Sequence, residues 1–505
     1  MYEVKNMKAL LVYPSYPDTF WSFRSILPFV SKKAAFPPLG LLTVAALLPE
    51  EWEKRVVDAN VAPLGDADLE WADLVMVSAM LVQVPGAKEV MRRAKLAGKT
   101  VIAGGPAFRA NLEEFPDADH FIIGESEVVM DAFLNDFEHG TAKRQYGSSE
   151  RPDLSLTPLP AWHLLKMKDY VSMAVQYSRG CPFDCEFCGI MVMNGRRPRV
   201  KSPEQMLREF QSLYDAGWRD SVFIVDDNFI GNLVQVKQFL PRLAAWQKQR
   251  NYPFKLMTEA SVNLAQDSEL MEMMSAANFH KVFIGIETPS TQSLVECGKK
   301  QNVTADFGSA VRDIHQHGMQ VMGGFIVGFD SDTPSIFEQQ HRFIQDIGVV
   351  TAMVGVLNAL PHTRLWDRLK AEGRLLDGWS GENTDASLNF NPLMGCTALL
   401  DGYKKLLGAL YSPRKYYDRI STFLHFYIPT ARGRIMRTDV QAFMKSMWSV
   451  GIISPARMLY WKLIFKTLLT KPKALSAVVE LAILGLHFER VSHRVMESPS
   501  PEGCM

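Results

Sequence analysis

Cys181-Pro-Phe-Asp-Cys185-Glu-Phe-Cys188 places three of the chain's six cysteines within eight consecutive positions. A zinc site usually takes a fourth cysteine or histidine, and no histidine lies within fifteen residues of this segment. Three thiolates on a cubane iron–sulfur cluster instead leave one iron open to a substrate or cofactor. We therefore expect Cys181, Cys185 and Cys188 to bind one 4Fe-4S cluster. An incomplete zinc site or an incidental cysteine-rich loop is the alternative.

The cysteine segment follows the first of six short, mostly apolar runs. These runs are residues 171–177, 222–226, 254–258, 282–286, 321–327 and 352–357. Stretches of helical length, such as 203–216 and 267–277, separate them. Six strand–helix units in succession indicate a barrel or partial barrel, whose active site lies at the carboxyl ends of its strands.

Five further apolar runs precede this region, again with helical stretches between them. They are residues 8–13, 55–58, 73–78, 100–103 and 120–123. The pattern predicts a parallel sheet with helices on both faces, as in a Rossmann-like domain. A dinucleotide role is not expected, because no GxGxxG follows the first run. Gly104-Gly105-Pro106 comes directly after a strand and would let the backbone approach a ligand.

From about Cys396 onward the pattern is helical, without strands, and it is basic. Residues 402–494 hold 16 Lys and Arg against 4 Asp and Glu, although the whole chain carries 55 of each kind. The zero net charge excludes a globally basic nucleic-acid binder. No run of about 18 uncharged apolar residues predicts a membrane span, and no signal peptide is recognisable at the start. With few cysteines to form disulfides, we expect a cytoplasmic protein.

The predicted organisation is therefore α/β with a helical end. We expect a Rossmann-like domain over residues 1–145, a linker rich in Pro, Gly and Ser over 146–168, a barrel over 169–395 and a basic helical domain over 396–505. Both α/β domains would carry ligands at the carboxyl ends of their strands.

The cysteine spacing, with Phe187 before the third cysteine, resembles the radical S-adenosylmethionine (SAM) superfamily. The resemblance implies a partial (β/α)6 TIM barrel in which the open iron binds SAM and SAM is cleaved to a 5′-deoxyadenosyl radical. It also implies a set of SAM-binding residues: Phe187, Asp226, Asp227, Asn228, Glu259, Ser261, Glu287 and Ile326. The family's Gly-Gly-Glu triplet is absent, and Asp226-Asp227-Asn228 takes its place.

A Rossmann-like domain directly before such a barrel resembles the cobalamin-binding class of this superfamily, the class B radical SAM methylases. The resemblance implies cobalamin contacts from Tyr16, Ser78, Gly104, Gly105 and Pro106. The DxHxxG loop that supplies a histidine to cobalt is absent, and no histidine precedes His120. We therefore expect cobalamin without a protein histidine on cobalt. A domain that has lost its cofactor is the alternative.

Segments along nearly the whole chain, among them 32–40, 176–182 and 225–232, resemble the subfamily that includes the hopanoid C-2 methylase. The C-methylases of bacteriochlorophyll biosynthesis are related to it. The resemblance implies transfer of a methyl group from methylcobalamin, recharged by SAM, to an unactivated carbon of a hopanoid or a chlorin. It also implies an electron donor of the flavodoxin or ferredoxin type.

Two other functions stay open at this point. One is a cyclase, an oxidoreductase or a carbon–carbon bond-forming enzyme of the same architecture. The other is a non-catalytic cobalamin or iron–sulfur sensor, for which no effector domain is recognisable. No catalytic side chain is assigned; His280, His315 and His362 are candidates for a base by residue type alone.

The basic helical domain suggests where the protein would encounter its substrate. Apolar residues at spacings of three and four stand among Arg457, Lys462 and Lys466. These apolar residues are Tyr460, Trp461, Ile464, Phe465, Leu468 and Leu469. A helix of this kind can lie in the interface of a membrane with its basic groups at anionic head groups. We expect peripheral membrane contact, with a helical cap on the barrel as the alternative, and no nucleic-acid partner.

Overall fold

The computed structural model describes the chain except for residues 1–5, 110, 377–379, 431, 434–435 and 499–505. It divides into two compact units. The first comprises Met1–Pro17, Lys33–Val175 and Arg199–Trp218, and the second Asp18–Lys32, Gln176–Pro198 and Arg219–Met505. The bounds of the predicted domains stay predictions, and their ends at residues 1–5 and 499–505 lie outside the described residues.

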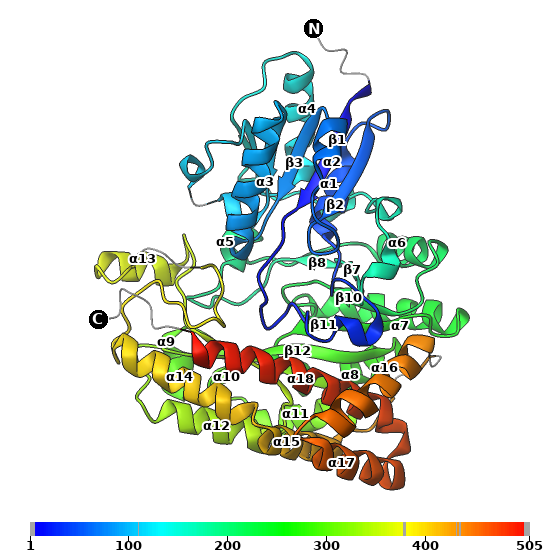
Figure 1. Ribbon diagram of the computed structural model, residues 1–505, viewed down its shortest axis with the longest axis vertical. Helices are drawn as coiled ribbons and strands as arrows, with labels where there is room; N and C mark the ends of the chain where they lie inside the picture. The colour runs from blue at the N-terminus through cyan, green and yellow to red at the C-terminus, as the bar shows by residue number, and fades with distance from the viewer. Residues whose placement is uncertain (1–5, 110, 377–379, 431, 434–435, 499–505) are drawn as a thin grey trace. The chain divides into compact units, whose positions relative to one another are not determined.

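The first unit is built on a parallel sheet with strand order β2-β1-β3-β4-β5-β6 (Figure 1). Its strands are β1 (Lys8–Tyr13), β2 (Glu53–Asp58), β3 (Leu74–Ser78), β4 (Thr100–Gly104), β5 (His120–Ile123) and β6 (Gln145–Gly147). The five expected strands are confirmed. The sixth, β6, begins one residue before the predicted linker and pairs with β5.

Helices cover both faces of this sheet, because alternate residues of its strands enter two different cores. Leu10 and Val12 of β1 pack in one cluster with Val90, whereas Ala9 and Leu11 pack in the other with Leu41. A strand buried on both faces reads as a continuous apolar run, as β1 does. The helices of this unit are α1 (Leu39–Leu47), α2 (Asp66–Trp71), α3 (Val84–Leu96), α4 (Met130–Glu138) and α6 (Pro203–Asp215).

Strands lie at all six positions predicted for the barrel. They are β7 (Met173–Val175), β10 (Ser221–Ile224), β11 (Lys255–Ala260), β12 (Phe279–Glu287), β13 (Gln320–Val327) and β14 (Thr351–Val356). Within the second unit, β10 to β14 pair in parallel in the order β14-β13-β12-β11-β10. Their carboxyl ends therefore meet at one edge. Two short strands, β8 (Ser178–Arg179) and β9 (Arg199–Val200), flank the cysteine segment.

Helices alternate with these strands as the sequence predicts. They are α5 (Ile190–Met193), α7 (Leu233–Gln249), α8 (Ser268–Ala276), α9 (Thr291–Glu296), α10 (Lys300–Val303), α11 (Phe307–Gln316), α12 (Ile336–Ile347) and α13 (Arg364–Ala371). Polar N-caps define several of their starts, as at α11, where the Asp306 side chain accepts a hydrogen bond from the Ser309 N–H.

The predicted helical C-terminal region is confirmed, and it lies beside α12 in the second unit (Figure 1, yellow to red). It consists of α14 (Cys396–Leu410), α15 (Pro413–Phe426), α16 (Arg437–Trp448), a π-helical turn (Ser449–Ile453), α17 (Arg457–Thr470) and α18 (Leu475–Glu497). Among the described helices, none is both long enough and apolar enough to cross a membrane.

One segment from the start of the chain packs with these last helices. Phe20 stacks on Phe488 of α18 with 4.5 Å between ring centroids, and a ring nitrogen of His487 lies 3.0 Å from the Phe20 carbonyl oxygen. Trp21 then reaches the sheet, where it contacts Phe283 of β12 and its indole N–H points at the Met353 sulfur of β14. Residues Asp18–Lys32 therefore belong to the second unit, although the strand that precedes them lies in the first.

The apolar residues at spacings of three and four on α17 differ in exposure. Tyr460 and Ile464 are buried against neighbouring helices, whereas Phe465, Leu468 and Leu469 are exposed. The spacing identified a helix with two apolar sides but did not distinguish the side that packs from the side that faces solvent.

Replacing Leu11 by Ala should destabilise the first unit. The side chain is fully buried, so its loss should lower the free energy of unfolding by about 2–5 kcal/mol. Leu96→Ala is the matched control, because Leu96 is 76% exposed and its truncation should change that free energy by no more than about 0.5 kcal/mol. Urea unfolding of both variants measures the difference; equal losses would contradict the two-sided core.

Candidate functional site

The carboxyl edge of the second unit's sheet carries most of the residues that the sequence singled out. Asp226, Asp227 and Asn228 follow β10, Ser261 follows β11, and Glu287 ends β12. Glu259 and Ile326 lie near the carboxyl ends of β11 and β13. Because these strands are parallel, their ends place all of these side chains at one edge, as predicted.

Asp226 anchors the chain that leads into the cysteine segment. It is buried, and its two carboxylate oxygens accept hydrogen bonds from the Tyr177 N–H at 2.8 Å and the Ser178 hydroxyl at 2.7 Å. Burial raises the pKa of Asp226 to about 7, although these hydrogen bonds act to lower it. In this structure the carboxylate is therefore occupied by the chain's own donors.

The next two residues hold the cysteine segment itself. Asp227 accepts from the Gly180 N–H at 3.1 Å and from the Asn194 amide at 2.9 Å. The Asn228 amide donates toward the Cys181 sulfur at 3.8 Å and to the Ser261 hydroxyl at 3.1 Å. Each member of this motif thus contacts the segment from 177 to 194, a role that the sequence did not indicate.

Gly180 permits the sharp turn into the first cysteine. Its φ is +100°, and a Cβ there would lie 2.8 Å from the Gly195 carbonyl oxygen. Only glycine adopts this backbone conformation without strain. The Cys181 N–H then donates to that same carbonyl at 3.2 Å, so that the segment forms a closed loop between residues 180 and 195.

Cys181, Cys185 and Cys188 are free thiols in this loop, hereafter the cysteine loop. Among the described residues, no three His, Cys, Asp or Glu side chains are placed to hold a single metal ion. The described side chains therefore form no mononuclear zinc site. A cubane does not need that convergence, because each of its thiolates binds a different iron.

A buried ion pair lies beside the cysteine loop. Glu287 has a φ of +68° at the end of β12, and its carboxylate pairs with the ammonium of Lys299. Gly285 leaves room for this pair, because a Cβ there would lie 2.5 Å from the Glu287 carboxylate and 2.7 Å from the Lys299 nitrogen. Burial alone would lower the pKa of Lys299, but Glu287 and the sulfurs of the loop raise it above its usual value.

The positive charge of Lys299 also affects the pKa values of the three thiols. Burial raises the pKa of all three, that of Cys188 to about 12, whereas the Lys299 charge acts to lower each of them. No pattern in the sequence indicated Lys299. Its only local signal is the turn at Gly298, with φ of +72°, that follows α9 and sets the direction of the chain.

Two apolar members of the predicted SAM set lie in one cluster at this edge. Phe187 packs against Phe329 with 6.2 Å between ring centroids, and Ile326 contacts the same buried cluster. Glu259 is the acidic neighbour on β11. Burial, together with the charges of Asp227 and Asp226, raises the pKa of Glu259 to about 8. At neutral pH its carboxyl group is therefore largely protonated and can donate a hydrogen bond.

The predicted cobalamin contacts come together in the first unit. Tyr16 follows β1, Ser78 ends β3, Gly104 ends β4, and Gly105 and Pro106 come next. Strand order reverses between β1 and β3, which flank one another in the sheet, and ligands of open α/β sheets bind at such a point. Gly105 has a φ of +101°, and a Cβ there would lie 2.9 Å from the Ala79 carbonyl oxygen. Glycine at position 105 therefore lets this turn approach the backbone at the end of β3 closely.

Of the three histidines considered as a base, only His362 follows the carboxyl end of a barrel strand. His280 lies at the start of β12, and a ring nitrogen is 2.8 Å from the Leu256 carbonyl oxygen. His315 is buried in α11 and accepts from the Val321 N–H at 3.2 Å. Burial lowers the pKa of both to about 3, so these two are structural, neutral histidines.

Comparison with protein families gives three matches. The radical SAM superfamily matches residues 175–344, a B12 binding domain matches residues 30–134, and a family described as a domain of unknown function matches residues 363–500.

Curated proteins resemble the chain over most of its length. A Synechocystis protein described as an uncharacterised methyltransferase is 40% identical, over 95% of this chain and 91% of its own. The hopanoid C-2 methylase of Rhodopseudomonas palustris is 35% identical, over 92% and 90%. The bacteriochlorophyllide d C-12(1)-methyltransferase of Chlorobaculum tepidum is 24% identical, over 76% and 84%.

Two solved structures share the fold at 14% sequence identity. The cobalamin-dependent SAM radical enzyme OxsB, with aqua-cobalamin and SAM bound, covers 99% of this chain and 82% of its own at a TM-score of 0.62. The radical SAM methyltransferase TsrM of Kitasatospora setae, with cobalamin and a [4Fe-4S] cluster bound, covers 94% and 99% at a TM-score of 0.61.

Glu259→Gln should remove a pH dependence of stability. Below pH 4.5 the carboxyl group is protonated in both folded and unfolded chains, but between 4.5 and about 8 only the unfolded chain ionises. The wild type should therefore lose stability relative to the Gln variant by up to about 1.4 kcal/mol per pH unit in this window. Urea unfolding at pH 5 and pH 8 measures this, with the exposed Glu70→Gln as control. A difference in stability between wild type and variant that is the same at both pH values would contradict the raised pKa of Glu259.

Proposed function

The chain belongs to the cobalamin-dependent radical SAM methyltransferases, and we propose that it methylates an unactivated carbon of a hydrophobic polycyclic molecule of the hopanoid type. Its cofactors are a 4Fe-4S cluster, SAM and cobalamin. The single observation that carries the substrate class is the 35% identity to a hopanoid C-2 methylase over 92% of this chain, helical end included. Similarity to the bacteriochlorophyllide methyltransferases is lower and covers 76%, which makes a chlorin the second choice.

The cysteine loop fits the cluster by the chemistry of its donors. Cys181, Cys185 and Cys188 would bind three irons, and Lys299 would offset part of the negative charge that their thiolates bring into a buried site. The Asn228 amide already donates toward the Cys181 sulfur. Hydrogen bonds to sulfur are among the factors that set the potential of such clusters.

The residues at this edge of the sheet offer groups for both ends of the SAM molecule. Asp227, Asn228 and Ser261 offer polar groups next to the cysteine loop, and Glu287 offers a carboxylate at the end of β12. Phe187 and Ile326 offer an apolar surface for the adenine. Glu259, protonated, would donate a hydrogen bond from β11. Asp226 would act through the loop that it anchors, since it is only 1% exposed.

When bound, the cluster and SAM supply a 5′-deoxyadenosyl radical, and cobalamin supplies the methyl group. The residues of this chain hold these groups and exclude water. In the first unit, Tyr16, Ser78 and the Gly104-Gly105-Pro106 turn would hold cobalamin at the point of strand-order reversal. No histidine precedes His120, so none of the residues proposed here to hold cobalamin is a histidine. An external donor of the flavodoxin or ferredoxin type would supply the electron.

The helical end would meet the substrate at an anionic membrane surface. Nine exposed large apolar side chains fall between residues 440 and 469, on α16, the π-helical turn and α17. They are Val440, Met444, Trp448, Ile452, Ile453, Met458, Phe465, Leu468 and Leu469. On α16 the spacing of four puts three of them on one side.

Basic side chains stand among these apolar ones. Lys462 and Lys466 are exposed next to Phe465, and Lys473 is exposed after the end of α17. A surface that combines exposed apolar groups with lysines fits the boundary between acyl chains and anionic head groups. Lys471 differs, because its ammonium donates to the carbonyl oxygens of Leu424, His425 and Tyr427 at the end of α15. It is a helix cap and not part of this surface.

Replacing any one of Cys181, Cys185 and Cys188 by Ala should abolish SAM cleavage, because one iron then lacks its ligand. Replacing all three should reduce iron after anaerobic reconstitution from about four atoms per chain to background. Cys396→Ala, a half-buried cysteine at the start of α14, should keep wild-type iron. Iron and acid-labile sulfide assays measure both. Four irons retained by the triple variant would contradict the cluster site.

The wild type should float with vesicles that contain anionic lipid and not with neutral vesicles. Lys462, Lys466 and Lys473 changed together to Glu should abolish flotation, because each lysine near such a surface contributes about 1 kcal/mol. Phe465→Ser with Leu469→Ser should weaken it without a change of charge. Lys88, Lys166 and Lys248 changed to Glu are the control for charge alone. If the control variant also fails to float with anionic vesicles, the α16–α17 surface is not the site of membrane contact.

A further inference from the structure

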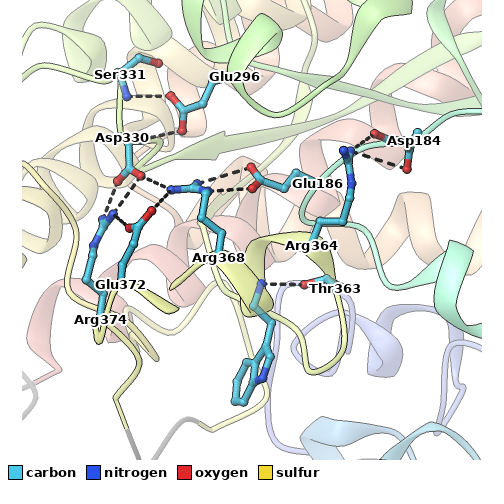
Figure 2. Close-up of polar contacts among 11 residues, drawn as sticks. Asp184, Glu186, Glu296, Asp330, Ser331, Thr363, Arg364, Arg368, Glu372 and Arg374 are labelled. Carbon is cyan, nitrogen blue, oxygen red and sulfur yellow. Dashed lines mark hydrogen bonds and ion pairs between the residues drawn. The ribbon is translucent and has the colours of Figure 1, made fainter. Parts of the chain in front are cut away.

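Helix α13 contacts the cysteine loop through two arginines one turn apart. Arg364 donates to the Asp184 carbonyl oxygen at 2.6 Å, and its guanidinium lies 3.6 Å from the Asp184 carboxylate. Arg368 contacts both carboxylate oxygens of Glu186, at 2.8 and 3.4 Å (Figure 2). Asp184 and Glu186 lie on either side of Cys185 in sequence. The helix therefore contacts the loop between its first and third cysteines.

The backbone of Glu186 is held as well as its side chain. Its N–H donates to the Cys297 carbonyl oxygen at 2.8 Å, and its carbonyl oxygen accepts from the Leu365 N–H of α13 at 3.2 Å. Three attachments to one residue, from α13 and from the end of α9, leave the loop little freedom around Cys185.

The same arginine reaches the end of β13. Arg368 donates to Asp330 at 2.7 Å, and Arg374 binds that carboxylate through two nitrogens at 2.5 and 3.0 Å (Figure 2). The Asp330 and Ser331 N–H groups donate to the Glu296 carboxylate at 2.9 and 2.8 Å. Burial alone would raise the pKa of Asp330, but hydrogen bonds from Arg374 and Arg368 hold it below its usual value.

These pairs differ from the exposed ion pairs of the chain. The side chains of Glu186 and Asp330 are 13% and 17% exposed, and that of Arg368 is 31% exposed. The Arg342–Glu338 pair on α12 is 70% and 76% exposed. Exposed pairs contribute little, whereas an arginine that bridges two shielded carboxylates fixes their separation.

We propose that Arg368 is a positioning residue that fixes the cysteine loop to the carboxyl end of β13. The loop carries Cys185 and Cys188, and β13 carries Ile326, so Arg368 holds the proposed cluster ligands and the proposed adenine surface as one body. The inference rests on the proposed cluster site. The proposal also gives a role to α13, the first helix within residues 363–500, which match the family described as a domain of unknown function.

The test compares Arg368→Gln with Arg368→Lys and with Arg342→Gln as the matched control on α12. All three are reconstituted anaerobically as full chains. In Arg368→Gln, iron should pass to a chelator about ten-fold faster than in the wild type, as for other partners that orient metal ligands. The change that SAM produces in the EPR signal of the reduced cluster should also shrink. Arg368→Lys keeps the positive charge but loses the bidentate guanidinium group. Its iron-release rate and EPR change should therefore lie between those of the wild type and Arg368→Gln. Arg342→Gln should match the wild type in both.

Glu186→Gln gives the same test from the other end, in case Arg368→Gln does not fold. If the two residues act as one unit, the double variant should release iron no faster than the worse single variant. Iron release and EPR signals equal to the wild type in both single variants would overturn the proposal while leaving the cluster site intact. A wild type that takes up no cluster, or a triple cysteine variant that keeps one, would overturn the cluster site and the proposal with it.

Discussion

Parallel pairing of strands is the constraint on which both candidate sites depend. In the first unit it brings the ends of β1, β3 and β4 to one edge, and in the second it does the same for β10 to β13. Residues as far apart in sequence as Asp226 and Ile326 then share a surface. Any change that reversed or shifted one strand would remove its contribution to that surface, because a shift by one residue turns every side chain to the other face.

The second constraint is the cost of burying charge beside the cysteine loop. Asp226, Glu259 and the three thiols all lie where burial favours their neutral forms. Lys299 pairs with Glu287 next to the thiols, and Arg368 bridges Glu186 to Asp330. The proposed thiolate-bound cluster would add negative charge to this environment, and Lys299 and Arg368 would offset part of it.

Local signals explain what the sequence predicted and what it missed. The apolar runs and the cysteine spacing each lie within a few residues. They predicted the strands and the helical end, which the structure confirms, and the residues of the two sites, which stay predictions. Arg368 and Glu186 are 182 residues apart, and no local pattern links them. The sequence placed Asp226 at the correct edge but could not show that its partners would be Tyr177 and Ser178. On α17, the helical period could not separate the buried Tyr460 from the exposed Phe465.

Methyl transfer to an unactivated carbon of a hydrophobic polycycle is the proposed reaction. The most direct measurement is the mass of the product formed anaerobically from a hopanoid extract by the chain loaded with cluster and cobalamin, with SAM labelled in its methyl group. We expect a product heavier by one methylene that carries the label, together with 5′-deoxyadenosine. A product that has lost hydrogen or gained oxygen, without label, would exclude methyl transfer and would indicate a cyclase or an oxidoreductase instead.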